Sequence, residues 1–215
     1  MNLSTLMLLL ALALAGCASK VPVPAWKADA GSSLKAFSNA YLKGDTALAQ
    51  TEFTRARGEL ASTGRPDLVA HAELYRCATQ VASIEYGHCP GFAAVAQDAT
   101  PAEHAYANYL AGRFSGIELA LLPEQHRAIV QGRAALATIA DPLSRLVAAG
   151  VLMRAARIAP ADIVVATNTA SDQGWRRPLL MWLGVALKRA QAAGDAAEAA
   201  RIERRIELAG AVVRP

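Results

Sequence analysis

The sequence lacks the short motifs that mark most enzyme and metal sites. It contains no Cys-x-x-Cys, no Gly-x-Ser-x-Gly and no glycine-rich phosphate loop. Its histidines are scattered, without a His-x-x-x-His pair or a carboxylate at ligand spacing: His71, His88, His104 and His126. We therefore predict that the protein is not an enzyme and has no catalytic residue, cofactor-binding residue or metal ligand. A hydrolase whose active site is assembled only in space is the least favoured alternative.

The chain also lacks any block of basic residues. Its formal net charge is +4, from 22 Lys and Arg against 18 Asp and Glu, and the excess is spread along the sequence. Segments that bind nucleic acid usually concentrate their basic residues. We therefore predict no nucleic-acid partner, and at most a weak attraction to anionic lipid or peptidoglycan.

Charged side chains are missing altogether from Leu3 to Gly16, a stretch composed mostly of Leu and Ala. A membrane-spanning helix needs about 20 apolar residues, whereas the apolar part of a secretory signal has about 7–15 and ends in small residues. Ala15 and Gly16 are such small residues. We therefore predict that residues 1–16 are a signal peptide rather than a membrane span.

The four residues Leu14-Ala15-Gly16-Cys17 resemble the lipobox of bacterial lipoproteins. The resemblance implies that the signal is removed before Cys17, that the Cys17 thiol is linked to diacylglycerol, and that the new amine is acylated. Several acyl chains on one residue would make the membrane anchor effectively permanent. Ala18 after the cysteine implies, by the same resemblance, the outer membrane, with the protein on its periplasmic side. The alternative is an N-terminal helix packed on the body, with Cys17 a buried thiol.

The remaining chain is predicted to form one domain behind a short tether. Pro22 and Pro24 favour an extended conformation, so residues 17–31 are expected to be the lipidated tether. Trp26 in this tether is expected either to dock on the body or to lie at the lipid headgroups. Residues 32–210 are expected to form a single all-α domain, and residues 211–215 a tail.

Two cysteines remain after Cys17, and an exported protein enters an oxidising compartment. Cys77 falls inside a helical pattern from Asp67 to Ile84, and Cys89 lies in a turn rich in Gly and Pro. We predict a structural disulfide between Cys77 and Cys89, which would stabilise the fold by roughly 3 kcal/mol. A metal or redox pair involving His88 is the alternative.

The body repeats one pattern: a capping residue, apolar residues three and four apart, and then Gly or Pro. This pattern predicts an all-α fold. The β-branched run at 163–165 would also suit a strand, but no neighbouring segment offers it a partner. Helices are expected to begin at Ser32 or Ser33, Asp45, Asp67, Phe92, Thr100, Pro123, Asp141, Pro160, Pro178 and Asp195.

Pro142 and Pro178 begin equivalent helices at a spacing typical of helix-pair repeats. Gly44-Asp45 followed by Ala49, Phe53 and Ala56 resembles the second half of a tetratricopeptide repeat, and Gly194-Asp195 with Ala199 partly repeats it. The resemblance implies antiparallel helix hairpins stacked as a tetratricopeptide-like array. An irregular helical bundle is the alternative.

Trp175, Arg176 and Arg177 lie at a predicted interhelix turn and are the candidate partner contacts, because Trp and Arg are enriched in interface anchors. The alternatives are that Trp175 plugs the core and that the arginines bind helix-end carbonyls. The sequence as a whole predicts a non-catalytic, lipid-anchored scaffold that faces the periplasm and binds a protein partner. A helical module that binds a small molecule or lipid is the second interpretation.

Overall fold

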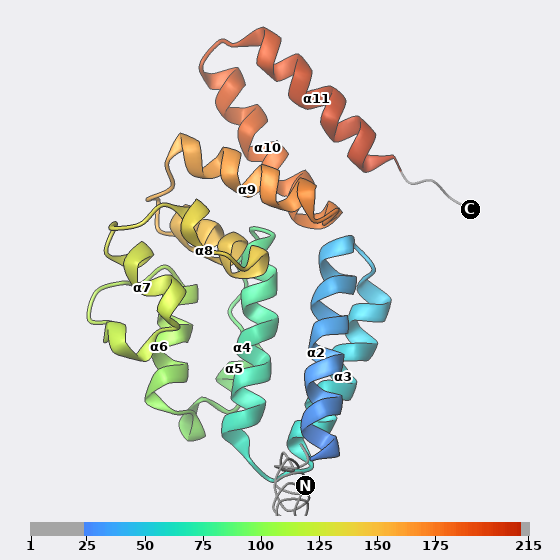
Figure 1. Ribbon diagram of the computed structural model, residues 1–215, viewed down its shortest axis with the longest axis vertical. Helices are drawn as coiled ribbons and strands as arrows, with labels where there is room; N and C mark the ends of the chain where they lie inside the picture. Colours follow the sequence, from blue (N-terminus) through green and yellow to red (C-terminus); the bar gives the residue numbers. More distant parts are fainter. Residues whose placement is uncertain (1–23, 212–215) are drawn as a thin grey trace, which may run out of the picture.

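The computed structural model describes residues 24–211, and within this range the chain is all-α, as predicted, with no strand. The longer helices pack against one another, and short 3₁₀ turns (η) join some of them (Figure 1). The elements are α2 (Ala25–Lys43), α3 (Thr46–Ala61), α4 (Pro66–Ala82), α5 (Pro90–Ala93), η1 (Ala96–Asp98), α6 (Pro101–Leu110), η2 (Leu119–Leu121), α7 (Glu124–Val130), η3 (Leu136–Thr138), α8 (Pro142–Arg154), α9 (Pro160–Asp172), α10 (Arg176–Ala192) and α11 (Ala196–Gly210).

Helix α4 lies between two groups of helices (Figure 1). The α2–α3 hairpin lies on one side, and α6 with α7 lies on the other. Helix α8 packs on α4 and α9, and α10 joins α9 to α11 while also contacting α2. Helix pairs thus form both ends of the fold, whereas residues 83–141 hold short helices and turns that interrupt the regular pairing.

Four of the predicted helix caps are present. Side-chain oxygens of Asp45, Thr100, Asp141 and Asp195 each accept a hydrogen bond from a backbone N–H in the first turn of the helix that follows. Asp195 begins the outermost helix, α11, which joins the fold through a small apolar contact with α10. Local capping chemistry therefore sets where these four helices begin.

Three predicted helix starts were wrong, and one of them is the short helix α5, which begins at Pro90 rather than Phe92. Helix α2 begins at Ala25 rather than Ser32 or Ser33, so the predicted tether, residues 17–31, is helical from Ala25 onward. The Pro24 carbonyl accepts the first hydrogen bonds of this helix, and the half-buried Trp26 packs against the core. Helix α10 begins at Arg176 rather than Pro178. Pro178 is tolerated in the first turn, because the N–H group that proline lacks would have no intrahelical partner there.

Helix α8 is the centre of the fold, as its apolar sequence predicts. Residues 146–152 are all buried. At Gly150 the helix crosses α4 so closely that a Cβ atom would overlap the carbonyl group of Val81. The hydroxyl of Tyr86 donates a hydrogen bond of 2.9 Å to the Gly150 carbonyl. A glycine is therefore required where the two helices cross.

A buried carboxylate ties α3 and α5 to α4. Glu73 is 2 % exposed, and its two oxygens lie 2.9 Å from Nε of Arg57 and 2.6 Å from Nη2 of Arg76. Gly91 in α5 lies directly against the Glu73 side chain, where a Cβ atom would overlap it. Removing either arginine would leave the buried Glu73 carboxylate with one ion pair fewer, and an unpaired buried charge is costly in a protein interior.

The helix crossing makes a direct prediction for stability. Gly150→Ala should lower the free energy of unfolding by about 3 kcal/mol, because the added methyl group overpacks backbone that has no room to move. Gly184→Ala is the matched control, because Gly184 is also inside a helix but has open space at its Cβ position. Urea unfolding should show the control unchanged or stabilised by up to about 1 kcal/mol. Equal stability of the two variants would contradict the role given to Gly150.

Candidate functional site

A pocket of about 570 Å³ lies between α4, α6, α7 and α8. The pocket wall is mostly apolar and aromatic, and it includes His126 of α7. We call this pocket the His126 pocket. The apolar wall includes Leu74, Ala78, Leu122, Leu143 and Val147. Polar side chains that also line it are His71, Glu103, Gln125, Arg127, Asp141 and Ser144. The pocket is thus an apolar hollow with a few polar groups.

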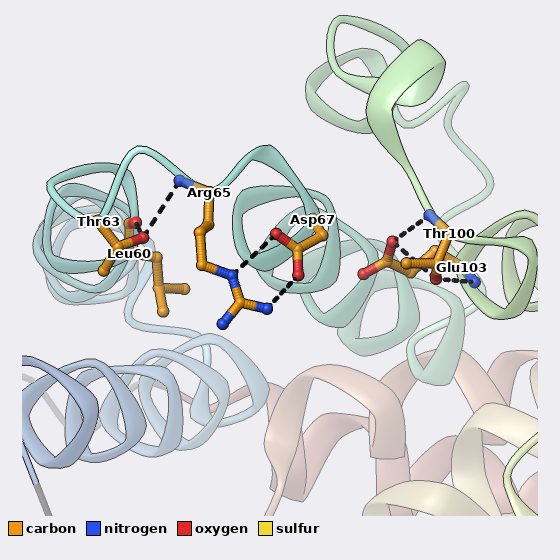
Figure 2. A network of polar contacts seen from close by, with 6 residues as sticks. All are labelled: Leu60, Thr63, Arg65, Asp67, Thr100 and Glu103. Atoms are coloured by element: carbon orange, nitrogen blue, oxygen red, sulfur yellow. Dashed lines mark hydrogen bonds and ion pairs between the residues drawn. The ribbon is translucent and has the colours of Figure 1, made fainter.

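Local polar networks fix the starts of two helices that line the pocket (Figure 2). At the start of α4, Nη2 of Arg65 lies 2.6 Å from Oδ2 of Asp67, and the Arg65 N–H donates to Oγ1 of Thr63 at 3.3 Å. At the start of α6, the Thr100 N–H donates to Oε2 of Glu103 at 2.8 Å, and the Glu103 N–H donates to Oγ1 of Thr100 at 3.4 Å. The capping box places Glu103 at the pocket and sets the register of the α6 tyrosines.

Both tyrosines of α6, Tyr106 and Tyr109, lie beside His126. The Tyr109 hydroxyl lies 3.0 Å from Nδ1 of His126, and both residues are almost fully buried, at 0 % and 1 % exposure. Their ring centroids are 4.8 Å apart. Tyr106 stacks on Tyr109 at 5.8 Å and lines the pocket beside His126. Tyr106 and His126 line the His126 pocket, and the fully buried Tyr109 contacts both of them from behind the wall.

Burial keeps this pair uncharged. It lowers the pKa of His126 to about 4, although the negative charge of Asp141 nearby acts in the opposite direction. Burial also raises the pKa of Tyr109 well above its usual value, and the neighbouring Tyr106 adds to this rise. At neutral pH the pocket therefore presents a neutral imidazole held by a neutral phenol.

The predicted disulfide is confirmed. Cys77 of α4 and Cys89 are joined, with their Cα atoms 5.9 Å apart. Cys89 has a positive φ of 47°, which turns the chain back toward α4 just before α5 begins. The predicted lipidation site, Cys17, lies outside the described residues.

Arg177, a predicted partner contact, makes its polar contacts within the chain. Its Nε donates 2.7 Å to the Tyr41 carbonyl, and its Nη2 donates 2.7 Å to Oγ1 of Thr46. Its Nη1 lies 3.3 Å from Oε1 of Glu85, and its guanidinium stacks 4.2 Å from the centroid of the Tyr41 ring. Arg177 therefore clamps the start of α10 onto the α2–α3 turn.

The other two predicted contacts are half-buried. Trp175 packs against the core, and the guanidinium of Arg176 lies beside Gly44, the residue that ends α2. All three residues thus sit where α10 meets the first hairpin. None of them lines the His126 pocket.

The residues that form the pocket were not singled out from the sequence. Tyr106 and Tyr109 lie in the helix predicted to begin at Thr100, and His126 is one of the scattered histidines. Tyr106 and Tyr109 are three residues apart, a spacing that indicates a shared helix face. The contact between Tyr109 and His126 forms only when α7 folds back on α6 after Pro123, which a local sequence pattern does not reveal.

No protein-family model, curated protein or solved structure matches this chain. Within residues 24–211, no group of three or more His, Cys, Asp or Glu side chains is placed to hold a metal ion. In the same range, no ion pair joins a histidine to a carboxylate. No described helix has both the length and the apolar character needed to cross a membrane.

The lowered pKa of His126 predicts how stability depends on pH. Because the folded state holds this imidazole neutral down to about pH 4, the unfolded state binds more protons between about pH 6.5 and 4. As pH falls through that window, the protein should lose about 3 kcal/mol of stability from this group alone. The double variant Tyr109→Phe/His126→Phe should lack that contribution.

Urea unfolding of both proteins at pH 7.5 and pH 4 measures the difference, since the other titrating groups are common to both. Equal loss of stability in the two proteins would show that His126 is not held neutral by burial.

Proposed function

We propose that the protein is a non-catalytic, lipid-anchored binding module of the cell outer membrane, held on the periplasmic side by acyl chains on Cys17. Its His126 pocket binds a small, largely apolar molecule. The lipobox-like residues 14–17 support the location, and the pocket supports the activity.

The pocket is the observation that carries the proposal. Small-molecule sites are usually hollows of about 300–1,000 Å³, lined by apolar and aromatic side chains with a few polar groups that orient the ligand. At about 570 Å³, with Leu74, Leu122 and Val147 in its wall and His126 among its polar groups, this pocket fits that description. Among the interpretations that the sequence left open, it favours the small-molecule or lipid-binding module.

The surroundings of His126 are poorly suited to hydrolysis. A histidine base works best with a pKa near the operating pH and with a carboxylate that orients its ring. Here burial lowers the pKa to about 4, and the orienting partner of Nδ1 is the Tyr109 phenol. We therefore propose binding without catalysis.

A protein partner is the second candidate function. Apolar side chains are exposed on the three C-terminal helices, at Val164, Met181 and Leu208. The half-buried Trp175 and Arg176 lie at the turn that joins α9 to α10. Large side chains of this kind are common in interface anchors. None of these side chains lines the His126 pocket.

The ligand-binding proposal predicts that an uncharged apolar dye will bind. N-phenyl-1-naphthylamine should gain fluorescence on binding to the mature protein, and Ala102→Trp should weaken its affinity at least roughly tenfold by filling the pocket. Ala161→Trp is the matched control, because both alanines are exposed, follow a proline in the first turn of a helix and precede an acidic residue. Equal dye affinity in the two variants would place the dye elsewhere and contradict the proposal.

The anchor is tested separately at the N-terminus. Mass spectrometry of the protein purified from bacterial membranes should find a mature chain that begins with an acylated Cys17. A Cys17→Ser protein should be released from the membrane fraction, because the acyl chains supply the attachment. An intact Met1 or an unmodified Cys17 thiol would refute the lipid anchor without affecting the pocket.

A further inference from the structure

One polar atom of the His126 ring has no hydrogen-bond partner among the described residues. Nδ1 is bound to Tyr109, while Nε2 makes no hydrogen bond with any described residue. Within residues 24–211, two side-chain polar atoms are fully enclosed and make no hydrogen bond. They are Oε2 of Glu73, which is ion-paired with Arg76, and Oγ of Ser83, so Nε2 of His126 is not one of them. Nε2 is therefore not enclosed by the protein, and since His126 lines the pocket, the pocket is the space that Nε2 reaches.

The Tyr109 hydroxyl decides which nitrogen carries the proton. This hydroxyl is buried and has no other hydrogen-bond partner among the described residues. A buried O–H group without an acceptor is costly, so the hydroxyl donates to Nδ1. A neutral imidazole carries one proton, which must then lie on Nε2. The ring consequently presents an N–H donor to the pocket.

The charged groups around the pocket select against an anion. Two carboxylates, those of Glu103 and Asp141, line the pocket, against the single guanidinium of Arg127. That guanidinium already donates to the backbone carbonyls of Leu122, at 2.8 Å, and Ala120, at 2.9 Å. A ligand carboxylate would meet the two acidic side chains, whereas an uncharged acceptor would not be repelled.

We propose that the His126 pocket recognises an uncharged carbonyl group on an otherwise apolar molecule, such as a long-chain ketone or ester. The carbonyl oxygen accepts a hydrogen bond from the Nε2–H of His126, and the hydrocarbon chain packs against Leu74, Leu122 and Val147. Tyr106 lines the same pocket, and its hydroxyl, which has no partner among the described residues, is a second possible donor to the ligand. This inference rests on the proposed ligand-binding function.

The inference is tested with ligands of equal length in the mature protein. Bound N-phenyl-1-naphthylamine is displaced by 2-tridecanone, by tridecane or by dodecanoate. The ketone should bind roughly tenfold more tightly than the alkane, because it alone satisfies the buried donor. It should also bind more tightly than dodecanoate.

A double variant assigns the preference to His126. Tyr109→Phe/His126→Phe removes the donor together with the hydroxyl that depends on it, so that no buried polar group is left unpaired. The variant should lose the preference for the ketone over tridecane. Circular dichroism and urea unfolding at pH 7.5 verify that the variant is folded. If it is not, Tyr109→Phe alone should reduce the preference, because Nδ1 is then free to carry the proton.

The outcomes distinguish a failure of the carbonyl assignment from a failure of the proposed ligand-binding function. Equal affinities for ketone and alkane in the natural protein, a preference that survives in the double variant, or tighter binding of dodecanoate would each overturn the carbonyl assignment while leaving ligand binding intact. Dye binding that Ala102→Trp does not weaken would instead overturn the ligand-binding function. ¹⁵N NMR of the histidine rings should find the His126 proton on Nε2, and a proton on Nδ1 would also overturn the assignment.

Discussion

The close crossing of α4 and α8 at Gly150 is the constraint on which most of the fold depends. The last turn of a helix has carbonyl groups that lack intrahelical partners, and the end of α4 uses its backbone to position other elements. Gly150 packs directly on the Val81 carbonyl, and Nε1 of the fully buried Trp182 donates a 3.2 Å hydrogen bond to the Ala82 carbonyl. One helix end thus positions α8 and α10 at once, and Tyr86 in the following loop reaches back to the Gly150 carbonyl.

The His126 pocket follows from that crossing. Helices α4 and α8 supply two of its walls, so the distance between them at Gly150 limits how far the walls can separate. Helices α6 and α7 complete the pocket, and the Tyr109–His126 contact joins them. The disulfide and the buried Glu73 hold the loop before α6 onto α4. The pocket is therefore built on two helices that are held close together.

The sequence predicted the features that depend on local chemistry. Capping oxygens at Asp45, Thr100 and Asp195 act on N–H groups within the next turn, so a short pattern reveals them. The Cys77–Cys89 pairing was also predictable, because few cysteines remain to be paired. The start of α2 was missed because the serines at 32 and 33 resemble caps, although the preceding alanine-rich residues also favour a helix.

Features that depend on distant parts of the chain could not be predicted in this way. Arg177 was expected at a surface because it follows a tryptophan at a turn, but its acceptors belong to the α2–α3 hairpin. Gly150 lies in the helix predicted to begin at Asp141, but its role depends on which helix crosses it. The Tyr109–His126 contact likewise needs the fold of α7 on α6. The candidate site was therefore hidden in the sequence, while the helices that carry it were largely visible.

The chemistry of the Tyr109–His126 pair supports recognition better than stability. A neutral buried hydrogen bond contributes only about 1 kcal/mol net, and two apolar rings of similar shape could fill the same space at little cost. The buried imidazole also makes the fold less stable in acid, because its proton affinity is lowered on folding. What two apolar rings could not provide is an uncharged N–H group at the pocket. Under the proposed function, such a donor would penalise ligands that leave it unpaired, and the polar pair would add selectivity that apolar side chains alone would lack.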